Sequence, residues 1–252
     1  MTDILSKPRE DITEADIRAL TETKVPESET LEFKSELPSE PGVPDPWMRG
    51  KDEISAYAKQ KIVEEAVAFA NAYGGVLVLG IGEEKTVATN VTPIRDCKTL
   101  ADRLKLVFRD CVDPQLPHIE IFDVETEGSA GVLLIRAPKS RLAPHAVRYL
   151  GKSRNAKNYL KCPIRRSDRC ETMTMREIQD MTLNLSRGHL RIDTALAKRA
   201  DLFSEEFYRL HRHDRAYGLR FTALPVGDDV RIDRLLNGEV LDARFDVPSI
   251  SV

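Results

Sequence analysis

Residues 66–83 read AVAFANAYGGVLVLGIGE, and this stretch decides the fold. A helix is expected to end at Gly74, because glycine readily takes the left-handed conformation that closes a helix. Residues 76–79 follow without a linker and are apolar on both faces, which is typical of a central strand. Upstream, apolar or small residues recur every three or four positions from Ile54 to Tyr73, so the helix starts near Asp52.

The remaining pattern predicts an α+β fold, in which a mixed β-sheet packs against helices and a small α/β appendage follows. Residues 31–37 alternate apolar and charged side chains, as in a half-buried strand. Proline-rich residues 38–46 favour an exposed loop. Further helices are expected at 13–24, 99–112, 174–185 and 192–210, and further strands at 118–125, 131–135, 146–150, 158–162, 219–223 and 230–232.

Three segments follow from this pattern: an N-terminal helix (1–24), a main domain (25–187) and an accessory region (188–252). The main boundary is placed at Arg187-Gly188, where the character of the sequence changes. The two strands expected in the accessory region form too small a sheet to fold alone. We therefore expect this region to dock on the main domain or on a second copy of the chain, as in a homodimer.

Charge is distributed unevenly along the chain. The 252 residues carry a formal net charge of -3, which argues against a protein that is basic throughout. Between Arg136 and Arg169, however, eleven residues are basic and only Asp168 is acidic. Such a local excess is typical of a surface that binds polyanions, although a charge run is more commonly a solvated face.

The four cysteines have neither the spacing of a zinc site nor a neighbouring histidine, so they are expected to be reduced, buried or half-buried thiols. No apolar run approaches the roughly 18 residues that span a bilayer, and residues 1–8 lack the pattern of a signal peptide. These features predict a cytoplasmic protein.

Several short segments, in a fixed order, resemble the signature of the Schlafen AlbA-like domain family. The resemblance covers roughly residues 25–185. It implies nucleic-acid binding and, by analogy with some members, RNA cleavage. The segments are LEFK at 31–34, AFAN at 68–71 with Gly74-Gly75, GIGE at 80–83, a proline-bounded segment at 138–144, and CPIRR at 162–166 followed by ETM at 171–173.

Nuclease-type members of this family place two acids five positions apart, as Glu27 and Glu32 are here. In an extended strand such residues point to opposite faces, so a bend before Leu31 is needed to bring them together. The resemblance implies that Glu27 and Glu32 hold Mg²⁺ or Mn²⁺ and that an acid just after the glycine-bounded strand completes a catalytic set. Glu83 and Glu84 are the candidates for this acid, and Glu83 is the one assigned. Gly82 stands where the family often has aspartate. Solvated acids on a surface strand are the commoner alternative.

The basic segment, residues 136–169, supplies most of the residues expected to bind nucleic acid. Arginine and lysine neutralise phosphates, and Tyr149 and Tyr159 either stack on bases or pack as strand residues. Lys34 either contacts phosphate or pairs with Glu32. The glycines of residues 74–82 lack the Gly-Lys-Ser/Thr of a phosphate-binding loop. The expected nucleic-acid-binding residues are Lys34, Arg148, Lys152, Arg154, Lys157, Lys161, Arg165 and Arg166.

Three functions remain open from the sequence. The first is a nucleic-acid-binding protein, for DNA or RNA, with a regulatory role such as transcriptional control and no required cofactor. The alternative is a metal-dependent ribonuclease that uses Glu27, Glu32 and Glu83 on structured RNA such as tRNA. The third is an interaction module whose basic surface binds an acidic protein.

Overall fold

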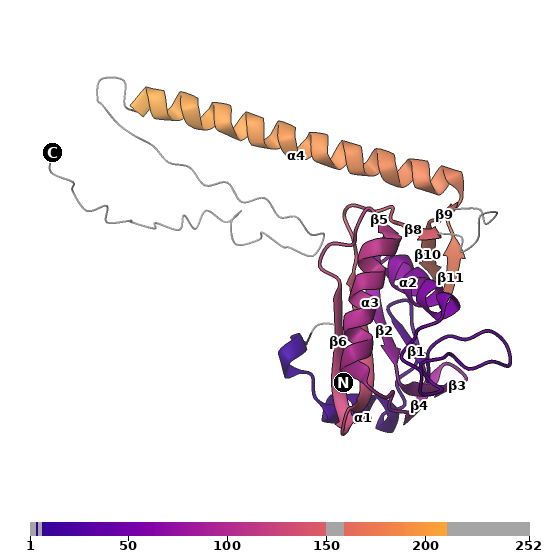
Figure 1. Cartoon of the computed structure of the whole chain (residues 1–252). Helices are drawn as coiled ribbons and strands as arrows, with labels where there is room; N and C mark the ends of the chain where they lie inside the picture. Colours follow the sequence, from indigo (N-terminus) through magenta and orange to yellow (C-terminus); the bar gives the residue numbers. More distant parts are fainter. Residues whose placement is uncertain (1–3, 5–6, 150–158, 211–252) are drawn as a thin grey trace, which may run out of the picture. The chain divides into compact units, whose positions relative to one another are not determined.

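The computed structural model describes residues 4, 7–149 and 159–210 (Figure 1). The chain divides into two units, residues 1–186 and residues 187–252. The predicted strands at 219–223 and 230–232 lie outside the described residues. The helical elements are η1 (Arg9–Asp11), α1 (Glu14–Glu22), α2 (Ala56–Asn71), α3 (Cys97–Cys111) and α4 (Met175–Leu210). No described helix is both long enough and apolar enough to cross a membrane.

The first unit is built on a four-stranded mixed sheet in the order β1-β2-β7-β6. β1 runs parallel to β2, whereas β7 is antiparallel to both of its neighbours. The strands are β1 (Leu31–Lys34), β2 (Gly74–Leu79), β3 (Ile81–Glu84), β4 (Val87–Val91), β5 (Val112–Asp113), β6 (Glu120–Glu127), β7 (Ala130–Pro138), β8 (Ala146–Tyr149), β9 (Tyr159–Lys161), β10 (Pro163–Arg166) and β11 (Arg169–Thr172).

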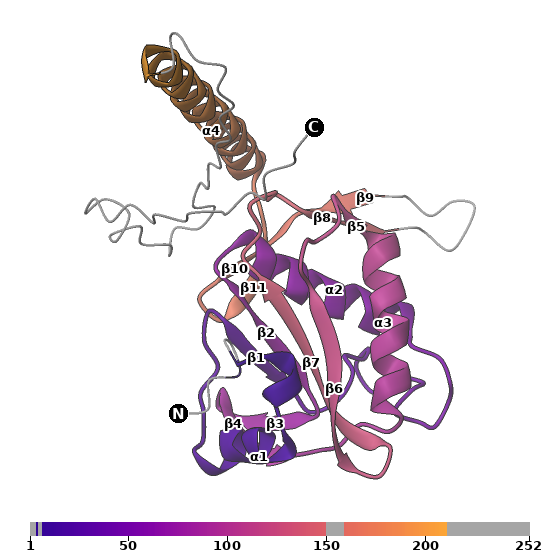
Figure 2. The ribbon, with the colours of Figure 1, turned by 90° about the vertical axis from the view of Figure 1, so that its left-hand side faces the viewer.

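Helices cover both faces of this sheet (Figure 2). Leu77 and Leu79 of β2 pack with α2 and α3, while Val76 and Val78 pack with α1 and the N-terminal segment. β2 lies between two strands and is buried on both faces, as its uninterrupted apolar sequence predicts. The predicted α+β class, with a mixed sheet packed against helices, is confirmed.

Local signals set the helix ends. The Ser55 hydroxyl accepts a hydrogen bond from the Ala58 amide at 3.0 Å and caps α2. α2 ends at Asn71 with Ala72 as its C-cap, so Gly74, expected to close the helix, is instead the first residue of β2, where it has a φ of +79°. At the start of α4, Thr174 and Glu177 exchange the reciprocal hydrogen bonds of a capping box.

Two expectations about these elements are wrong. α4 runs without interruption through Arg187-Gly188, where the sequence predicts a break between two helices. One glycine costs a helix only about 1 kcal/mol relative to alanine, which is too little to end a long helix. Tyr73, expected to extend the apolar stripe of α2, lies beyond the end of that helix and is exposed.

Candidate functional site

The structure brings the three acids of the expected catalytic set together. Glu27 precedes β1, Glu32 lies on β1 and Glu83 lies on β3. Reciprocal backbone hydrogen bonds between Ser28 and Leu31 form the bend that the spacing requires. Beyond this bend, Glu27 accepts a hydrogen bond from the Phe33 amide at 2.9 Å and forms a side-chain hydrogen bond with Glu83.

The environment of Glu27 raises its pKa to about 7. Burial is the largest cause, and the hydrogen bond with Glu83 and the nearby charge of Glu32 act in the same direction, whereas the Phe33 amide opposes them. Glu27 and Glu83 thus form a carboxyl pair that retains a proton near neutral pH.

We predict that Glu27→Gln flattens the dependence of stability on pH. Because its pKa is raised, folded Glu27 holds a proton between about pH 4.5 and 7 that the unfolded chain releases. The stability of the wild-type protein therefore falls as pH rises through this window. The glutamine of the variant keeps a side-chain oxygen that accepts the hydrogen bond from the Phe33 amide, but it carries no charge. We expect a gain of about 1–2 kcal/mol at pH 8, discounted for partial exposure, and none at pH 4.

Urea denaturation at pH 4, 6 and 8 measures this difference. Glu84→Gln, at an exposed position on the same strand as Glu83, is the control. An equal shift for both variants, or an unchanged slope against pH for Glu27→Gln, would contradict the assignment.

Glu32 already has two cationic partners. It is buried, and its carboxylate pairs with Lys34 and, at 2.5 Å, with the guanidinium of Arg165 on β10. Arg165 is only 2% exposed; it also contacts Glu65 of α2 at 3.1 Å and lies over the Phe69 ring, with 4.9 Å from its Cζ atom to the ring centroid. This arrangement joins β1, α2 and β10 in one buried ionic cluster.

The carboxylates of Glu27, Glu32 and Glu83 do not fit a divalent cation. Mg²⁺ and Mn²⁺ require several free oxygen ligands around one centre, but the Glu32 carboxylate is occupied by Lys34 and Arg165. Within the described ranges, no group of three or more His, Cys, Asp or Glu side chains could hold a metal ion. In this arrangement Glu27, Glu32 and Glu83 are neighbours whose existing pairing does not fit a divalent cation.

The basic residues expected to bind nucleic acid fall into three groups. Arg165 is buried in the ionic cluster, so its assignment to a phosphate-binding surface is corrected. The second group is paired with acids: Arg148 with Asp113 at 2.7 Å, Lys161 with Glu64 at 3.0 Å, and Arg166 with Glu171 and Glu177. Of these three, Arg148 and Arg166 remain partly exposed. Lys152, Arg154 and Lys157 lie outside the described residues.

Two hairpins carry the exposed basic side chains. β8 pairs antiparallel with β9, and β10 pairs antiparallel with β11, and both hairpins pack against α2. The pairing of β8 with β9 ends at Tyr149 opposite Tyr159, so residues 150–158 join two neighbouring strands. That segment contains three basic residues and no acidic one.

The AFAN motif with its glycines has a structural role that the sequence did not reveal. Asn71 is buried; its side-chain amide donates to the carbonyls of His145 and Pro163 and accepts from the His145 amide, at 2.8–2.9 Å. A Cβ atom at Gly75 would lie 2.4 Å from the Phe69 ring. The motif thus fixes the end of α2 to the segments that precede β8 and begin β10.

The cysteines match the expectation of unpaired thiols. All four are free and are buried or half-buried, and burial raises the pKa of both Cys97 and Cys170 to about 12. Thiols with such pKa values stay protonated at neutral pH, which does not suit nucleophilic attack.

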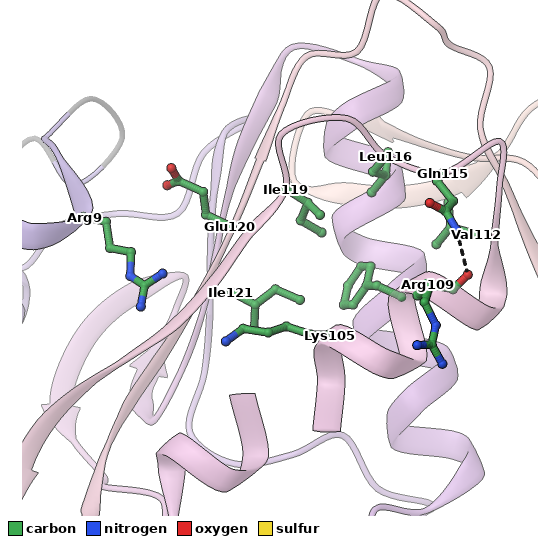
Figure 3. Close-up of a pocket in the computed structure, with 10 residues that line it drawn as sticks. Arg9, Lys105, Arg109, Val112, Gln115, Leu116, Ile119, Glu120 and Ile121 are labelled. Carbon is green, nitrogen blue, oxygen red and sulfur yellow. Dashed lines mark hydrogen bonds between the residues drawn. The ribbon is translucent and has the colours of Figure 1, made fainter. Parts of the chain in front are cut away.

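A pocket of about 290 Å³ lies between α3 and β6 (Figure 3). Phe108, Ile119 and Ile121 contribute apolar surface. Two cations of its lining, Lys105 and Arg109, pair with Asp102 and Asp110 on the same helix. It contains none of the predicted site residues.

Comparison with known proteins places this α+β domain among the Schlafen-type domains. The family model for Schlafen, AlbA_2 matches residues 27–174, more than half of the chain, so the chain belongs to this family. No curated protein matches it. Among solved structures it is similar to the DIP2311 protein from Corynebacterium diphtheriae, with 15% identity and a TM-score of 0.36, over 63% of this chain and 30% of that chain.

Proposed function

We propose that this Schlafen AlbA_2 domain binds nucleic acid through the β8–β9 and β10–β11 hairpins. The observation that carries the proposal is the antiparallel pairing of β8 with β9, because the sequence between these two strands contains three basic residues and no acidic one. Arg169 on β11 adds a guanidinium group with a side-chain exposure of 81%, and Arg148 on β8 is partly exposed although it pairs with Asp113. Cations on neighbouring hairpins can contact successive phosphates of one strand.

The surface is less basic than the sequence alone indicates. Acids from elsewhere in the chain neutralise Lys161, Arg165 and Arg166. From the sequence between β8 and β9, we assign further phosphate contacts to Lys152, Arg154 and Lys157. Binding to DNA or RNA in a regulatory role is the function that this surface supports best. The ribonuclease alternative gains no support from the carboxylates, because their geometry does not fit a metal.

We predict that replacing Lys152, Arg154 and Lys157 together by alanine weakens binding at least tenfold. Each lost phosphate contact also lowers the dependence on salt, so the slope of log affinity against log salt should fall by about 2–3. Fluorescence anisotropy with labelled tRNA and duplex DNA, between about 50 and 200 mM salt, measures both quantities.

The control replaces Lys85, Lys98 and Lys105, which lie in or beside other elements, by alanine and removes the same net charge. If both triple variants lose affinity equally, binding reflects overall charge, and the proposed surface is wrong.

The same incubations, with and without manganese and EDTA, are scored for cleavage. Metal-dependent cleavage that Glu27→Gln abolishes would restore the ribonuclease alternative.

A further inference from the structure

Two tyrosines form a stacked pair at the base of the β8–β9 hairpin. The rings of Tyr149 and Tyr159 have centroids 4.5 Å apart and planes inclined by 22°. Tyr149 is half-buried against the core formed with α2, whereas Tyr159 is 53% exposed. One face of the Tyr159 ring therefore lies against Tyr149, while much of the remaining ring surface is open to solvent.

Buried polar contacts hold the inner tyrosine in place. The Tyr149 hydroxyl donates to the carboxylate of Glu64, which also accepts hydrogen bonds from Gln60 at 3.1 Å and pairs with Lys161 at 3.0 Å. Burial opposes ionisation of Glu64, but the hydrogen bonds from Tyr149, Lys161 and Gln60 outweigh it and lower its pKa. Burial raises the pKa of Tyr149, so the hydroxyl remains a donor. The pair is thus a preformed support for a further ring.

A pocket with two cationic side chains in its lining lies on the Tyr149 side of this pair. A pocket of about 180 Å³ lies beside Tyr149, and its lining includes Lys59, Gln60, Val63 and Arg148. Its walls combine apolar side chains with the long cationic side chains of Lys59 and Arg148. An aromatic surface beside cations is the arrangement with which proteins bind unpaired bases and their phosphates together.

We propose that the Tyr149–Tyr159 pair is a stacking platform for an unpaired base, so that the ligand is single-stranded nucleic acid or an unpaired loop. This inference rests on the proposed function. Bases inside a duplex are covered on both faces by their neighbours, whereas an unpaired base can place one face on Tyr159. The cations nearby then contact the phosphates that flank the stacked base.

The test compares a labelled single strand of about 12 nucleotides, a length within the usual range of such sites, with the corresponding duplex. The full chain should bind the single strand more tightly. Tyr159→Ala should weaken single-strand binding by about 5- to 150-fold, which corresponds to the roughly 1–3 kcal/mol of one stacked base, and duplex binding by less than about twofold. Tyr159→Phe keeps the ring and should bind like wild type.

Leu160→Ala is the matched control, because Leu160 is the next residue and is similarly exposed, at 60%. It should leave both affinities unchanged. If Tyr159→Ala leaves single-strand binding intact, or weakens both ligands equally, the platform is refuted while the proposed function stands. If the wild-type chain binds neither ligand, the proposed function itself fails.

Discussion

Replacing Arg165 by methionine is expected to destabilise the first unit by about 3–5 kcal/mol, the typical cost of breaking a buried ion pair on one side. The guanidinium is 2% exposed and neutralises both Glu32 and Glu65. Methionine has a similar length but leaves the buried Glu32 without this partner. Burial and the charge of Glu32 already raise the pKa of Glu65, so losing the guanidinium should raise it further.

Thermal unfolding at pH 7, followed by circular dichroism, measures this loss as a fall in Tm of roughly 6–20 °C. Arg169→Met is the control, because Arg169 lies on the adjacent strand with an exposed side chain. Adding Glu32→Gln to Arg165→Met should recover part of the loss, since it removes the uncompensated charge. A Tm within about two degrees of wild type for Arg165→Met would refute the cluster.

Asn71→Ala is the second substitution with a large expected effect, a loss of about 3 kcal/mol or more. The buried amide of Asn71 satisfies three backbone groups, namely the amide and carbonyl of His145 and the carbonyl of Pro163. Alanine leaves these groups buried without their partner, and each such group costs about 1–3 kcal/mol. The segments before β8 and at the start of β10 should also open more often, because this side chain joins both to α2.

Hydrogen exchange and chemical denaturation test this prediction together. Asn184→Ala, at an exposed position of α4, removes the same amide and should change stability by less than about 0.5 kcal/mol. Asn71→Asp keeps an acceptor for the His145 amide but brings a carboxylate against two carbonyls, so it should not rescue the fold. Exchange in β8 and β10 at the wild-type rate in Asn71→Ala would show that the bridge is dispensable.

The main domain could be predicted from local patterns because its elements obey them. The apolar run of β2, the glycine after α2 and the spacing within α2 and α3 each depend on residues close together in the chain. The family match to residues 27–174 confirms the resemblance drawn from the short motifs. The continuity of α4 differs from the prediction because the change of character at Arg187-Gly188 is not enough to end a helix, since one glycine costs only about 1 kcal/mol.

The basic segment shows where sequence reading has its limit. Counting charge over residues 136–169 gives a large positive excess, yet several of the acids that neutralise these residues come from distant positions in the chain. The basic residues of β8 to β10 pair with acids on other elements, namely Glu64 and Glu65 on α2, Glu32 on β1 and Asp113 on β5. Charge balance is a property of the folded surface, so a local count overstates the surface available to phosphates.

The ionic cluster also sets a condition on synthesis of the chain. Arg165 and Glu32 are 133 positions apart, so β1 leaves the ribosome long before its buried counterion does. At about 5–20 residues per second the interval is roughly 7–27 s. During this time Lys34 can pair with Glu32, but the guanidinium of Arg165, which contacts both Glu32 and Glu65, has not yet been synthesised. The ionic cluster that joins β1 and α2 to β10 can therefore form only after β10 has emerged from the ribosome.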